Sequence, residues 1–382
     1  MFTDGRQYTT DDIINGGLGT DSITVLLGLA GGANLDAGTQ SGLSNVENIT
    51  FVQQGANVVT VDLITADANF VATDATISGA GVSGVMTINA TAETDSNVTI
   101  LGGTGNDILT GGTNPTKVDT ISGGLGTDTI TGGRGSDILT GGAGADIFSY
   151  TAVNQSSGTT PDSITDWLSG TDKLSVTLDL SSTVSAQTVN GTITTAKESV
   201  SAAQDSLTGN KGQIVYVTDD ETLYINMTAD NILTSLDYKI AVNSGATAAT
   251  TVAEGDVNWT LTGSSTAANT LTTGGGADIV TGGAAGDIID LGAGIDTYTG
   301  TLGADSVIGG LGADIITLSA ANDNERTSIK YTTKDDGGAA GTADDEDAVT
   351  LVDLNAGLSL IHISEPTRPE RIAYAVVCVK KK

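Results

Sequence analysis

Large apolar residues return every nine positions in two stretches of the chain, and small or polar residues flank each of them. The first stretch carries Ile121, Ile130, Leu139 and Phe148, and the second carries Val280, Ile289, Tyr298, Val307 and Ile316. A shorter stretch at the start of the chain keeps the same step with Ile14 and Ile23. The pattern fits short strands that each point one large side chain inward. One such residue cannot be buried by its own unit, so the units must stack, which predicts an all-β solenoid.

A glycine-rich turn precedes each short strand and ends in an aspartate. The Gly-Gly-x-Gly half permits positive φ angles and a close approach of the backbone to a ligand. The aspartates are Asp12, Asp21, Asp107, Asp119, Asp128, Asp137, Asp146, Asp278, Asp287, Asp296, Asp305 and Asp314. Stacking brings equivalent aspartates together, and two carboxylates about 5 Å apart repel by about 3 kcal/mol at an effective dielectric constant of ~20. A ladder of them therefore requires a counter-charge.

Calcium is the counter-charge that these residue types favour. Carboxylates and backbone carbonyls form the flexible oxygen cages that suit Ca²⁺, whereas Zn²⁺ prefers His and Cys. The only His and the only Cys are His362 and Cys378, both within residues 358–382. We therefore expect multiple Ca²⁺ sites at the repeat aspartates. The alternative is a metal-free β-solenoid in which Gly and Asp serve only the turns, although turns alone do not demand Asp at one constant position.

The nine-residue unit resembles the G-G-x-G-x-D-x-U-x nonapeptide of RTX (repeats-in-toxin) haemolysin-type proteins, a Ca²⁺-binding repeat. The resemblance implies a parallel β-roll with two nonapeptides per turn and Ca²⁺ between loops about eighteen residues apart. It pairs Asp119 with Asp137, Asp128 with Asp146, Asp278 with Asp296, Asp287 with Asp305, and Asp296 with Asp314. Loop carbonyls would complete the cages, at Gly103, Gly105, Gly124, Gly126, Gly133, Gly135, Gly142, Gly144, Gly283, Gly292, Gly294, Gly310 and Gly312. Positions that the repeat reserves for Gly hold Thr273, Ala285, Leu291 and Thr301, which predicts weaker binding there.

The segments between the repeats are also β-rich. Residues 25–100 contain short apolar runs separated by turn residues, which predicts an irregular β-solenoid. The segment after Phe148 resembles the one that follows the last repeat in serralysin-type C-terminal domains. The matching places are taken by Asp162, Ile164, Asp166, Trp167 and Asp172. We expect residues 151–245 to cap the exposed strand edges, with Trp167 in the core and one helix over 195–207.

These patterns divide the chain into seven segments. They are a partial RTX roll at 1–24, an irregular solenoid at 25–100, a first RTX roll at 101–150, a cap at 151–245, a second RTX roll with lead-in strands at 246–318, an acidic β-rich segment at 319–357 and a tail at 358–382. The tail shares no pattern with the rest and resembles the translation of a sequencing adapter. We therefore leave the tail out of the fold and expect the natural C-terminus to be missing.

Composition narrows the possible functions. The net charge of −31 repels nucleic acid and anionic membrane surfaces. No run of about eighteen apolar residues is present, so no membrane span is expected. Without a His in residues 1–357, that stretch cannot form an H-E-x-x-H zinc site or a Ser-His-Asp triad, and it has no G-x-x-x-x-G-K-[ST] phosphate loop. We expect this stretch not to be an enzyme.

The RTX resemblance also implies an expected function, which is secretion through a type I channel and folding on Ca²⁺ outside the cell. Two rolls interleaved with β-rich segments favour a structural surface-layer or adhesin-type protein at the bacterial cell surface. Its expected partners are calcium and either further copies of itself in a lattice or cell-surface polysaccharide. The alternative is a secretion and folding module of an RTX metalloprotease or toxin whose catalytic domain is absent from this sequence.

Overall fold

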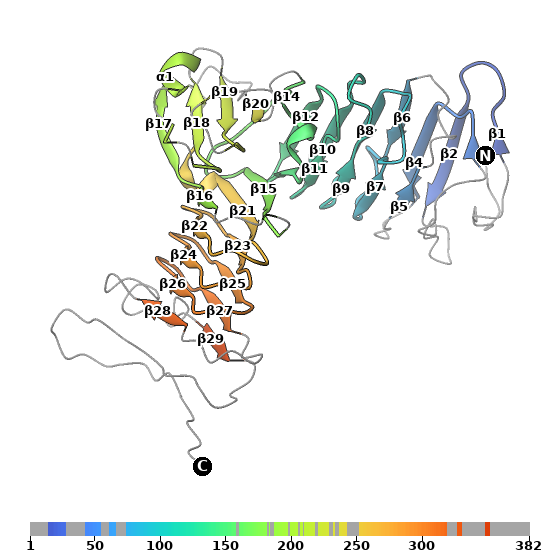
Figure 1. Cartoon of the computed structure of the whole chain (residues 1–382). Helices are drawn as coiled ribbons and strands as arrows, with labels where there is room; N and C mark the ends of the chain where they lie inside the picture. Colours follow the sequence, from blue (N-terminus) through green and yellow to red (C-terminus); the bar gives the residue numbers. More distant parts are fainter. Residues whose placement is uncertain are drawn as a thin grey trace. The chain divides into compact units, whose positions relative to one another are not determined.

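The computed structural model describes residues 14–27, 43–54, 61–65, 74–157, 160–181, 183, 187–197, 199–204, 207–208, 210–217, 221–228, 232–233, 237–242, 252–318, 327–330 and 348–351. Nearly all regular structure in these residues is β-strand (Figure 1). The chain divides into two compact units. The first comprises Met1–Val176 and Ile193–Asp256, and the second comprises Thr177–Thr192 and Val257–Lys382.

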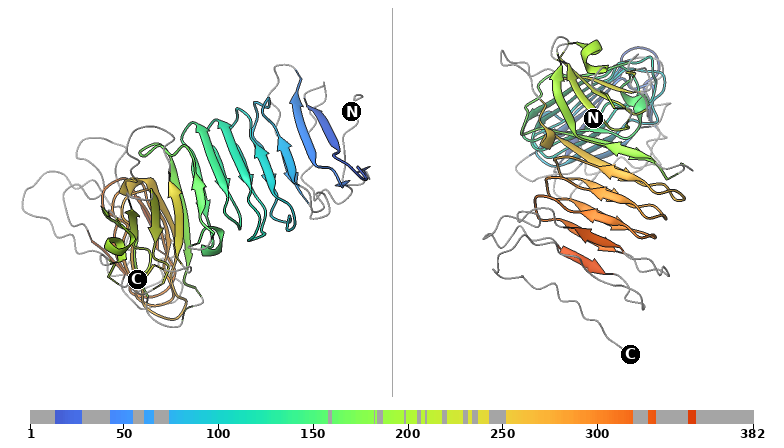
Figure 2. Two further views of the ribbon diagram at one scale, coloured as in Figure 1. Left: turned by 90° about the horizontal axis from the view of Figure 1, so that it is seen from above. Right: turned by 60° about the vertical axis from the view of Figure 1, so that its left-hand side comes forward.

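The first unit is a roll of two parallel sheets, and successive strands alternate between the sheets (Figure 1 and Figure 2). One sheet contains, in order, β2 (Ser22–Leu27), β4 (Asn48–Gln53), β6 (Ala75–Ser78), β8 (Val98–Leu101), β10 (Thr120–Leu125), β12 (Ile138–Ala143) and β14 (Asp162–Ile164). The other contains β5 (Val61–Ile64), β7 (Met86–Asn89), β9 (Ile108–Thr110), β11 (Thr129–Thr131), β13 (Ile147–Tyr150) and β15 (Lys173–Asp179). Strands β1 (Ile14–Asn15) and β3 (Leu43–Ser44) form a separate parallel pair.

Equivalent residues of the repeats lie directly opposite each other in neighbouring strands. Ile121 pairs with Leu139 across β10 and β12, and Ile130 pairs with Phe148 across β11 and β13. These strands are one turn of the roll apart, and the parallel β-roll implied by the RTX resemblance is confirmed. Turns that contain the insertion near Pro115 are longer, and they keep the same stacking.

The core of the first unit lies between the two sheets and is filled by at least one apolar side chain from each strand. The inward residues are fully buried: Ile77, Ile100, Ile121, Leu139 and Ile164 on one sheet, and Ile88, Leu109, Ile130, Phe148 and Leu174 on the other. Burying each of these side chains contributes about 1.5–3 kcal/mol. The neighbouring residues point outward because side chains alternate between the two faces of a strand.

A segment with both parallel and antiparallel strand pairs ends the first roll. Its elements are β17 (Ile193–Lys197), α1 (Val200–Gln204), β18 (Ile214–Val217), β19 (Thr222–Ile225) and β20 (Tyr238–Val242). Strand β20 adds in parallel to β14, and β18 and β19 continue antiparallel, with every residue of both strands buried. This segment covers the edge of β14, which would otherwise expose unpaired backbone groups.

The expectation of one helix over residues 195–207 is wrong. Residues up to Lys197 belong to β17, which pairs with β18, and the helix begins only at Val200. Pairing with a buried strand overrides the helical propensity of this Ala- and Ser-containing segment. Trp167 is a core residue as expected, because it is only 2% exposed and its ring centroid lies 6.2 Å from that of Phe148.

The second unit also consists of two layers of parallel strands. One sheet contains β21 (Val257–Thr262), β23 (Ile279–Thr281), β25 (Thr297–Gly300), β27 (Ile315–Leu318) and β29 (Ala348–Leu351). The other contains β16 (Thr188–Asn190), β22 (Thr270–Thr272), β24 (Ile288–Asp290), β26 (Ser306–Ile308) and β28 (Ser328–Lys330). Its fully buried inward positions include Val280, Tyr298 and Ile316 on one sheet and Leu271, Ile289 and Val307 on the other. Throughout the described part of the chain, no helix is long and apolar enough to cross a membrane.

The inward positions should dominate the stability of the first roll. We expect Leu139→Ala to lower the free energy of unfolding by about 2–5 kcal/mol, because it leaves a cavity in the core. The matched control is Ile138→Ala in the same strand, where the side chain is 41% exposed and the expected loss is below about 1 kcal/mol. Urea denaturation of the full chain in saturating Ca²⁺ measures both changes. Equal losses for the two variants would contradict the assignment of inward and outward faces.

Candidate calcium sites

Each repeat aspartate lies at or just before the start of a strand and uses one carboxylate oxygen to hold the previous turn. Its Oδ1 accepts the backbone N–H of the equivalent residue one turn earlier, at 2.7–3.1 Å in the first unit. Two ladders result. One contains Val98, Asp119, Asp137 and Asp162, and the other contains Met86, Asp107, Asp128, Asp146 and Asp172.

The second unit contains two further ladders with the same hydrogen bonds. One runs through Trp259, Asp278, Asp296 and Asp314, and the other through Asn269, Asp287 and Asp305, with N···O distances of 2.7–3.0 Å. All five expected aspartate pairs with 18-residue spacing are therefore neighbours in the structure. Asp12 lies outside the described residues. The N–H of Asp21 donates to Glu47 Oε2 at 2.6 Å, so a glutamate takes the place of the next aspartate there.

Burial makes the charged form of these carboxylates unfavourable. Asp128 and Asp137 are fully buried, and burial is the main reason why the pKa of each rises to about 7. Neighbouring carboxylates raise it further: Asp107 and Asp146 act on Asp128. Burial also raises the pKa of Asp278 to about 6. At neutral pH the ladders therefore hold negative charge in surroundings that favour a neutral group.

The second oxygen of several ladder aspartates is buried without a hydrogen-bond donor. Within the described residues, Oδ2 has no hydrogen-bond partner in Asp21, Asp128, Asp137, Asp146 and Asp278. A buried carboxylate oxygen without a donor costs free energy, and it normally has a partner such as a bound ion. These oxygens are therefore the first sign that the ladders hold cations.

The first glycine of three loops in the first unit faces a gap lined by oxygen. A Cβ added at Gly123 would lie 2.1 Å from Asp128 Oδ2 and 2.6 Å from the carbonyl oxygen of Gly141 in the next turn. A Cβ at Gly102 would meet Asp107 Oδ2 at 2.6 Å and the next-turn Gly123 carbonyl at 2.1 Å, and Gly111 has the same surroundings. A carboxylate oxygen and a carbonyl oxygen thus converge where only glycine leaves room.

This set of oxygens fits Ca²⁺. Within the described residues, no three carboxylates, histidines or cysteines gather around one point, so carboxylates alone do not form a site. Each ion would require carboxylate oxygens from the ladder together with backbone carbonyls, which is the hard, mixed oxygen set that Ca²⁺ prefers. The residues that would hold it in the first unit are those of stacked loops, such as Asp128, Asp146, Gly123 and Gly141.

Several loop glycines that were expected to supply carbonyls stack against glycines of the next turn. The carbonyl oxygens that face a glycine of the next turn belong to Gly103, Gly105, Gly124, Gly126, Gly292 and Gly294. Two of these carbonyls also accept a backbone N–H, Gly103 from Leu125 and Gly292 from Leu311. Left-handed φ angles occur at Gly124, Gly126, Gly133, Gly135, Gly142, Gly144, Gly292, Gly294, Gly310 and Gly312. Loop conformation as well as space therefore demands glycine at these positions.

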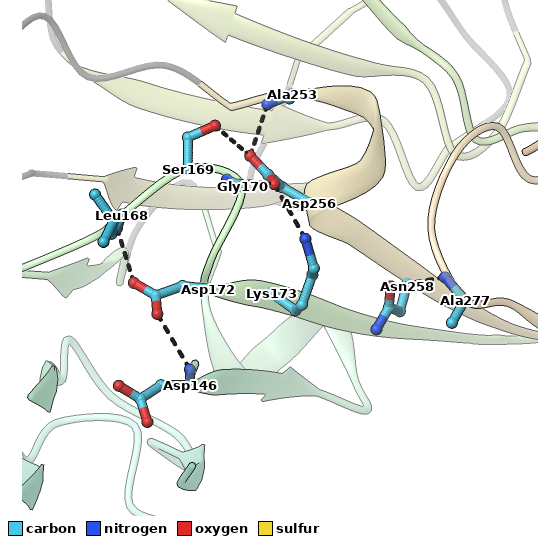
Figure 3. Close-up of polar contacts among 10 residues, drawn as sticks. All are labelled: Asp146, Leu168, Ser169, Gly170, Asp172, Lys173, Ala253, Asp256, Asn258 and Ala277. Atoms are coloured by element: carbon cyan, nitrogen blue, oxygen red, sulfur yellow. Dashed lines mark hydrogen bonds and ion pairs between the residues drawn. The ribbon is translucent and has the colours of Figure 1, made fainter. Parts of the chain in front are cut away.

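Two aspartates of the capping segment end the ladders of the first unit, a role that the sequence analysis did not assign to them. Asp162 accepts the N–H of Asp137, and Asp172 accepts the N–H of Asp146 with Oδ1 and that of Leu168 with Oδ2 (Figure 3). Both precede an inward apolar residue by two positions, as repeat aspartates do. They lie 25 and 26 residues after their partners, so the nine-residue period does not reveal them.

A further buried aspartate holds the end of the first roll. Asp256 is 1% exposed and accepts hydrogen bonds from Ser169 Oγ (2.5 Å), the Gly170 N–H (2.8 Å) and the Ala253 N–H (2.8 Å). It also forms an ion pair with Lys173 Nζ at 3.2 Å (Figure 3). Both oxygens of Asp256 therefore have donors, and Asp256 serves as a structural anchor for the loop before β15.

Comparison with known families agrees with this geometry. The model of the RTX calcium-binding nonapeptide repeat matches residues 9–28, 264–298 and 292–324. The chain contains RTX calcium-binding nonapeptide repeats. The model of the peptidase M10 serralysin C-terminal domain matches residues 72–252, which include the first RTX roll and its cap. A search of curated proteins returned no match.

These matches support a secreted calcium-binding RTX protein. RTX nonapeptide repeats bind calcium at multiple sites, and both matched domains are typical of secreted proteins. Both are non-catalytic domains. The ladder aspartates of the RTX rolls are therefore candidate calcium ligands.

Filling one oxygen-lined gap should weaken calcium binding by the first RTX roll. We expect Gly123→Ala to raise the Ca²⁺ concentration at the folding midpoint about tenfold, equivalent to about 1.4 kcal/mol, because its Cβ would displace Asp128 Oδ2 and the Gly141 carbonyl. Gly81→Ala is the matched control, since a Cβ there meets no atom within 4 Å. Circular dichroism during Ca²⁺ titration measures both midpoints. An unchanged midpoint for Gly123→Ala would contradict this location of the site.

Protons should partly replace calcium in the RTX ladders. In the folded state the pKa of Asp128 and Asp137 rises from 3.8 to about 7, so the metal-free fold binds more protons than the unfolded chain between these values. The stability of metal-stripped protein should therefore fall as pH rises from about 4 to 7. Urea denaturation of metal-stripped protein at a series of pH values tests this. A metal-free fold that gains stability over the same range would contradict the burial of charged ladders.

Proposed function

We propose that this RTX chain is a structural protein of the surface-layer or adhesin type, exported through a type I secretion channel and folded on Ca²⁺ outside the cell. The observation that carries the proposal is the run of buried aspartate ladders through both units. An enzyme needs one rigid site, whereas here the same ion-dependent turn repeats along most of the described chain. Such repetition suits a scaffold that must become stiff after export.

Calcium would act on folding through the ladder carboxylates. Inside a cell, where free Ca²⁺ is scarce, repulsion between stacked carboxylates and the entropy of the glycine-rich loops keep the repeats unfolded. Bound Ca²⁺ neutralises the facing carboxylates, and the binding free energy becomes folding free energy. At ten times its Kd, each ion contributes about 1.4 kcal/mol, so several sites produce a steep transition. Extracellular calcium modules often bind at about 10⁻⁴–10⁻³ M, which matches the concentrations met after export.

The expected partners follow from the same features. Calcium is the first, and a surface role adds either further copies of the chain in a lattice or a cell-surface polysaccharide. The net charge of −31 disfavours contact with other polyanions unless Ca²⁺ screens or bridges the charges. Both partner types would therefore bind in a calcium-dependent manner.

A second candidate function rests on the match to the serralysin C-terminal domain over residues 72–252. Proteins of that type carry a zinc protease domain before the RTX roll. In this reading the chain is the secretion and folding module of an RTX metalloprotease or toxin. Recovery of an adjoining coding sequence with an H-E-x-x-H motif would favour this function over the structural one.

Calcium-dependent attachment tests the structural role. Purified full chain should co-sediment with bacterial cell envelopes, or form ordered sheets visible by electron microscopy, in about 10⁻³ M Ca²⁺ and not in EGTA. The double variant Asp128→Asn, Asp146→Asn should lose this behaviour, because the ladder no longer holds the ion. Asp179→Asn, which changes an exposed aspartate outside the ladders, is the control and should attach normally.

Two results would oppose the proposal. A calcium-folded chain that neither assembles nor sediments would remove the structural role and leave the module function. Equal attachment of the wild type in Ca²⁺ and in EGTA would show that the ladders do not control it.

A further inference from the structure

One loop pair of the second unit differs from the oxygen-lined gaps of the first. It consists of residues 282–287 and 300–305, which precede β24 and β26. Asp305 Oδ1 accepts the N–H of Asp287 at 2.9 Å, as in every ladder. Its Oδ2, however, accepts a hydrogen bond from the hydroxyl of Tyr298 at 2.8 Å. This oxygen therefore has a side-chain hydroxyl donor, whereas Oδ2 of Asp128, Asp137 and Asp146 in the first unit has no hydrogen-bond partner.

The Tyr298 hydroxyl also fills the space that the first glycine leaves. A Cβ added at Gly282 would lie 2.7 Å from Tyr298 Oη, whereas Asp287 Oδ2 would be 3.3 Å away. Asp287 Oδ2 in turn accepts the N–H of Gly283 at 2.7 Å, as Oδ2 of Asp107 and Asp119 accepts a loop N–H in the first unit. In the first unit, the corresponding space beside Gly102, Gly111 and Gly123 is lined by a carboxylate oxygen and a carbonyl oxygen.

A second hydroxyl occupies the carbonyls of the same loops. Thr301 stands where the repeat has glycine, and its Oγ1 donates to the carbonyl oxygen of Gly283, with the Gly282 carbonyl 3.3 Å away. These are the carbonyls that would complete an oxygen cage between the two loops. A neutral hydroxyl therefore donates to each kind of oxygen that could bind an ion here. Tyr298 donates to the carboxylate of Asp305, and Thr301 donates to the carbonyl of Gly283.

Tyr298 reaches the loops because it takes an inward core position of β25. The equivalent inward residues of the first roll include Ile121, Ile130, Leu139 and Phe148, none of which carries a polar group. Burial and the nearby Asp305 raise the pKa of Tyr298 well above its usual range, so the hydroxyl keeps its proton and remains a donor. The substitution of one core side chain therefore changes the chemistry of the adjacent turn.

The neighbouring ladder of the second unit begins in a similar way. Thr273 replaces the first glycine of its loop, and its hydroxyl donates to the carbonyl oxygen of Leu291 in the next turn at 2.6 Å. At the start of the other ladder, Asn269 replaces aspartate and donates from Nδ2 to Asp287 Oδ1 at 3.0 Å. Neutral donors thus recur in the second unit at places where the first unit has glycine and aspartate.

We infer that the loop pair 282–287 and 300–305 is a metal-free counterpart of an RTX calcium site, in which the hydroxyls of Tyr298 and Thr301 replace the ion. The inference rests on the proposed calcium-dependent folding of the first unit. It also revises the expectation that Asp287, Asp305 and Gly283 bind calcium. The second roll consequently needs fewer ions per turn than the first and keeps this part of its structure at Ca²⁺ concentrations too low to fold the first.

Counting bound ions tests the inference directly. Equilibrium dialysis of the full chain against Ca²⁺ gives the number of ions bound by the wild type, by Asp305→Asn and by the matched variant Asp128→Asn in the first unit. We expect Asp305→Asn to keep the wild-type number, since Tyr298 Oη can accept a hydrogen bond from the new amide. Asp128→Asn should lose at least one ion. Loss of an ion in Asp305→Asn would overturn the inference.

A second variant tests the role of the hydroxyl itself. Tyr298→Phe keeps the ring in the core and leaves Asp305 Oδ2 without its hydroxyl donor. We expect amide hydrogen exchange over residues 279–308 to be slow in EGTA for the wild type and at least tenfold faster for Tyr298→Phe, with protection restored by Ca²⁺. The same exchange rates in both proteins, or fast exchange of this segment in the wild type, would overturn the inference.

The two failures can be told apart. If Asp128→Asn and Asp305→Asn both lose ions, calcium binding stands and only the metal-free loop pair is wrong. If the wild type binds no calcium at all, the proposed function fails together with the inference that rests on it.

Discussion

The electrostatic repulsion between buried carboxylates stacked one turn apart governs the whole architecture. Each nonapeptide buries one large apolar side chain, which stabilises the fold by about 1.5–3 kcal/mol. Each stacked carboxylate pair costs about 3 kcal/mol at an effective dielectric constant of ~20, and each ordered glycine adds about 0.5–1 kcal/mol. Core burial and charge repulsion are therefore of similar size, so a roll without counter-charge has no margin of stability. An ion at the ladder changes the balance from unfolded to folded.

In several ladder aspartates the two carboxylate oxygens divide the structural and ionic roles. In Asp128, Oδ1 holds the backbone N–H of Asp107 in the previous turn, and Oδ2 is buried without a donor beside Gly123. The fold and the calcium site therefore depend on the same side chain. The hydrogen bond from Oδ1 that sets the strand register also orients Oδ2 toward the gap beside the glycine. At Asp305 the hydroxyl of Tyr298 donates a hydrogen bond to this second oxygen. The oxygen therefore has a partner without an ion.

The nine-residue period was sufficient to predict a stacked all-β solenoid, its inward residues and the stacking of the repeat aspartates, and the RTX resemblance added the parallel β-roll. It could not reveal Asp162 and Asp172, because the turns that lead to them are longer than the repeat. The helix expected over 195–207 was wrong because strand pairing outweighs local propensity there. Periodicity shows that Tyr298 is an inward residue. It does not show that the Tyr298 hydroxyl reaches the next loop and donates to Asp305. Sequence patterns thus show which residues stack, whereas the partner of each oxygen requires coordinates.

A calcium titration of metal-stripped full chain, followed by far-ultraviolet circular dichroism, tests the central claim most directly. The account predicts little β signal in EGTA from the first roll, a steep gain at about 10⁻⁴–10⁻³ M Ca²⁺, and no equivalent gain with Mg²⁺, which demands a smaller and more rigid octahedral site. A chain that shows its full β signal in EGTA and does not respond to Ca²⁺ would contradict the account, because the buried carboxylate ladders would then be stable without a counter-charge.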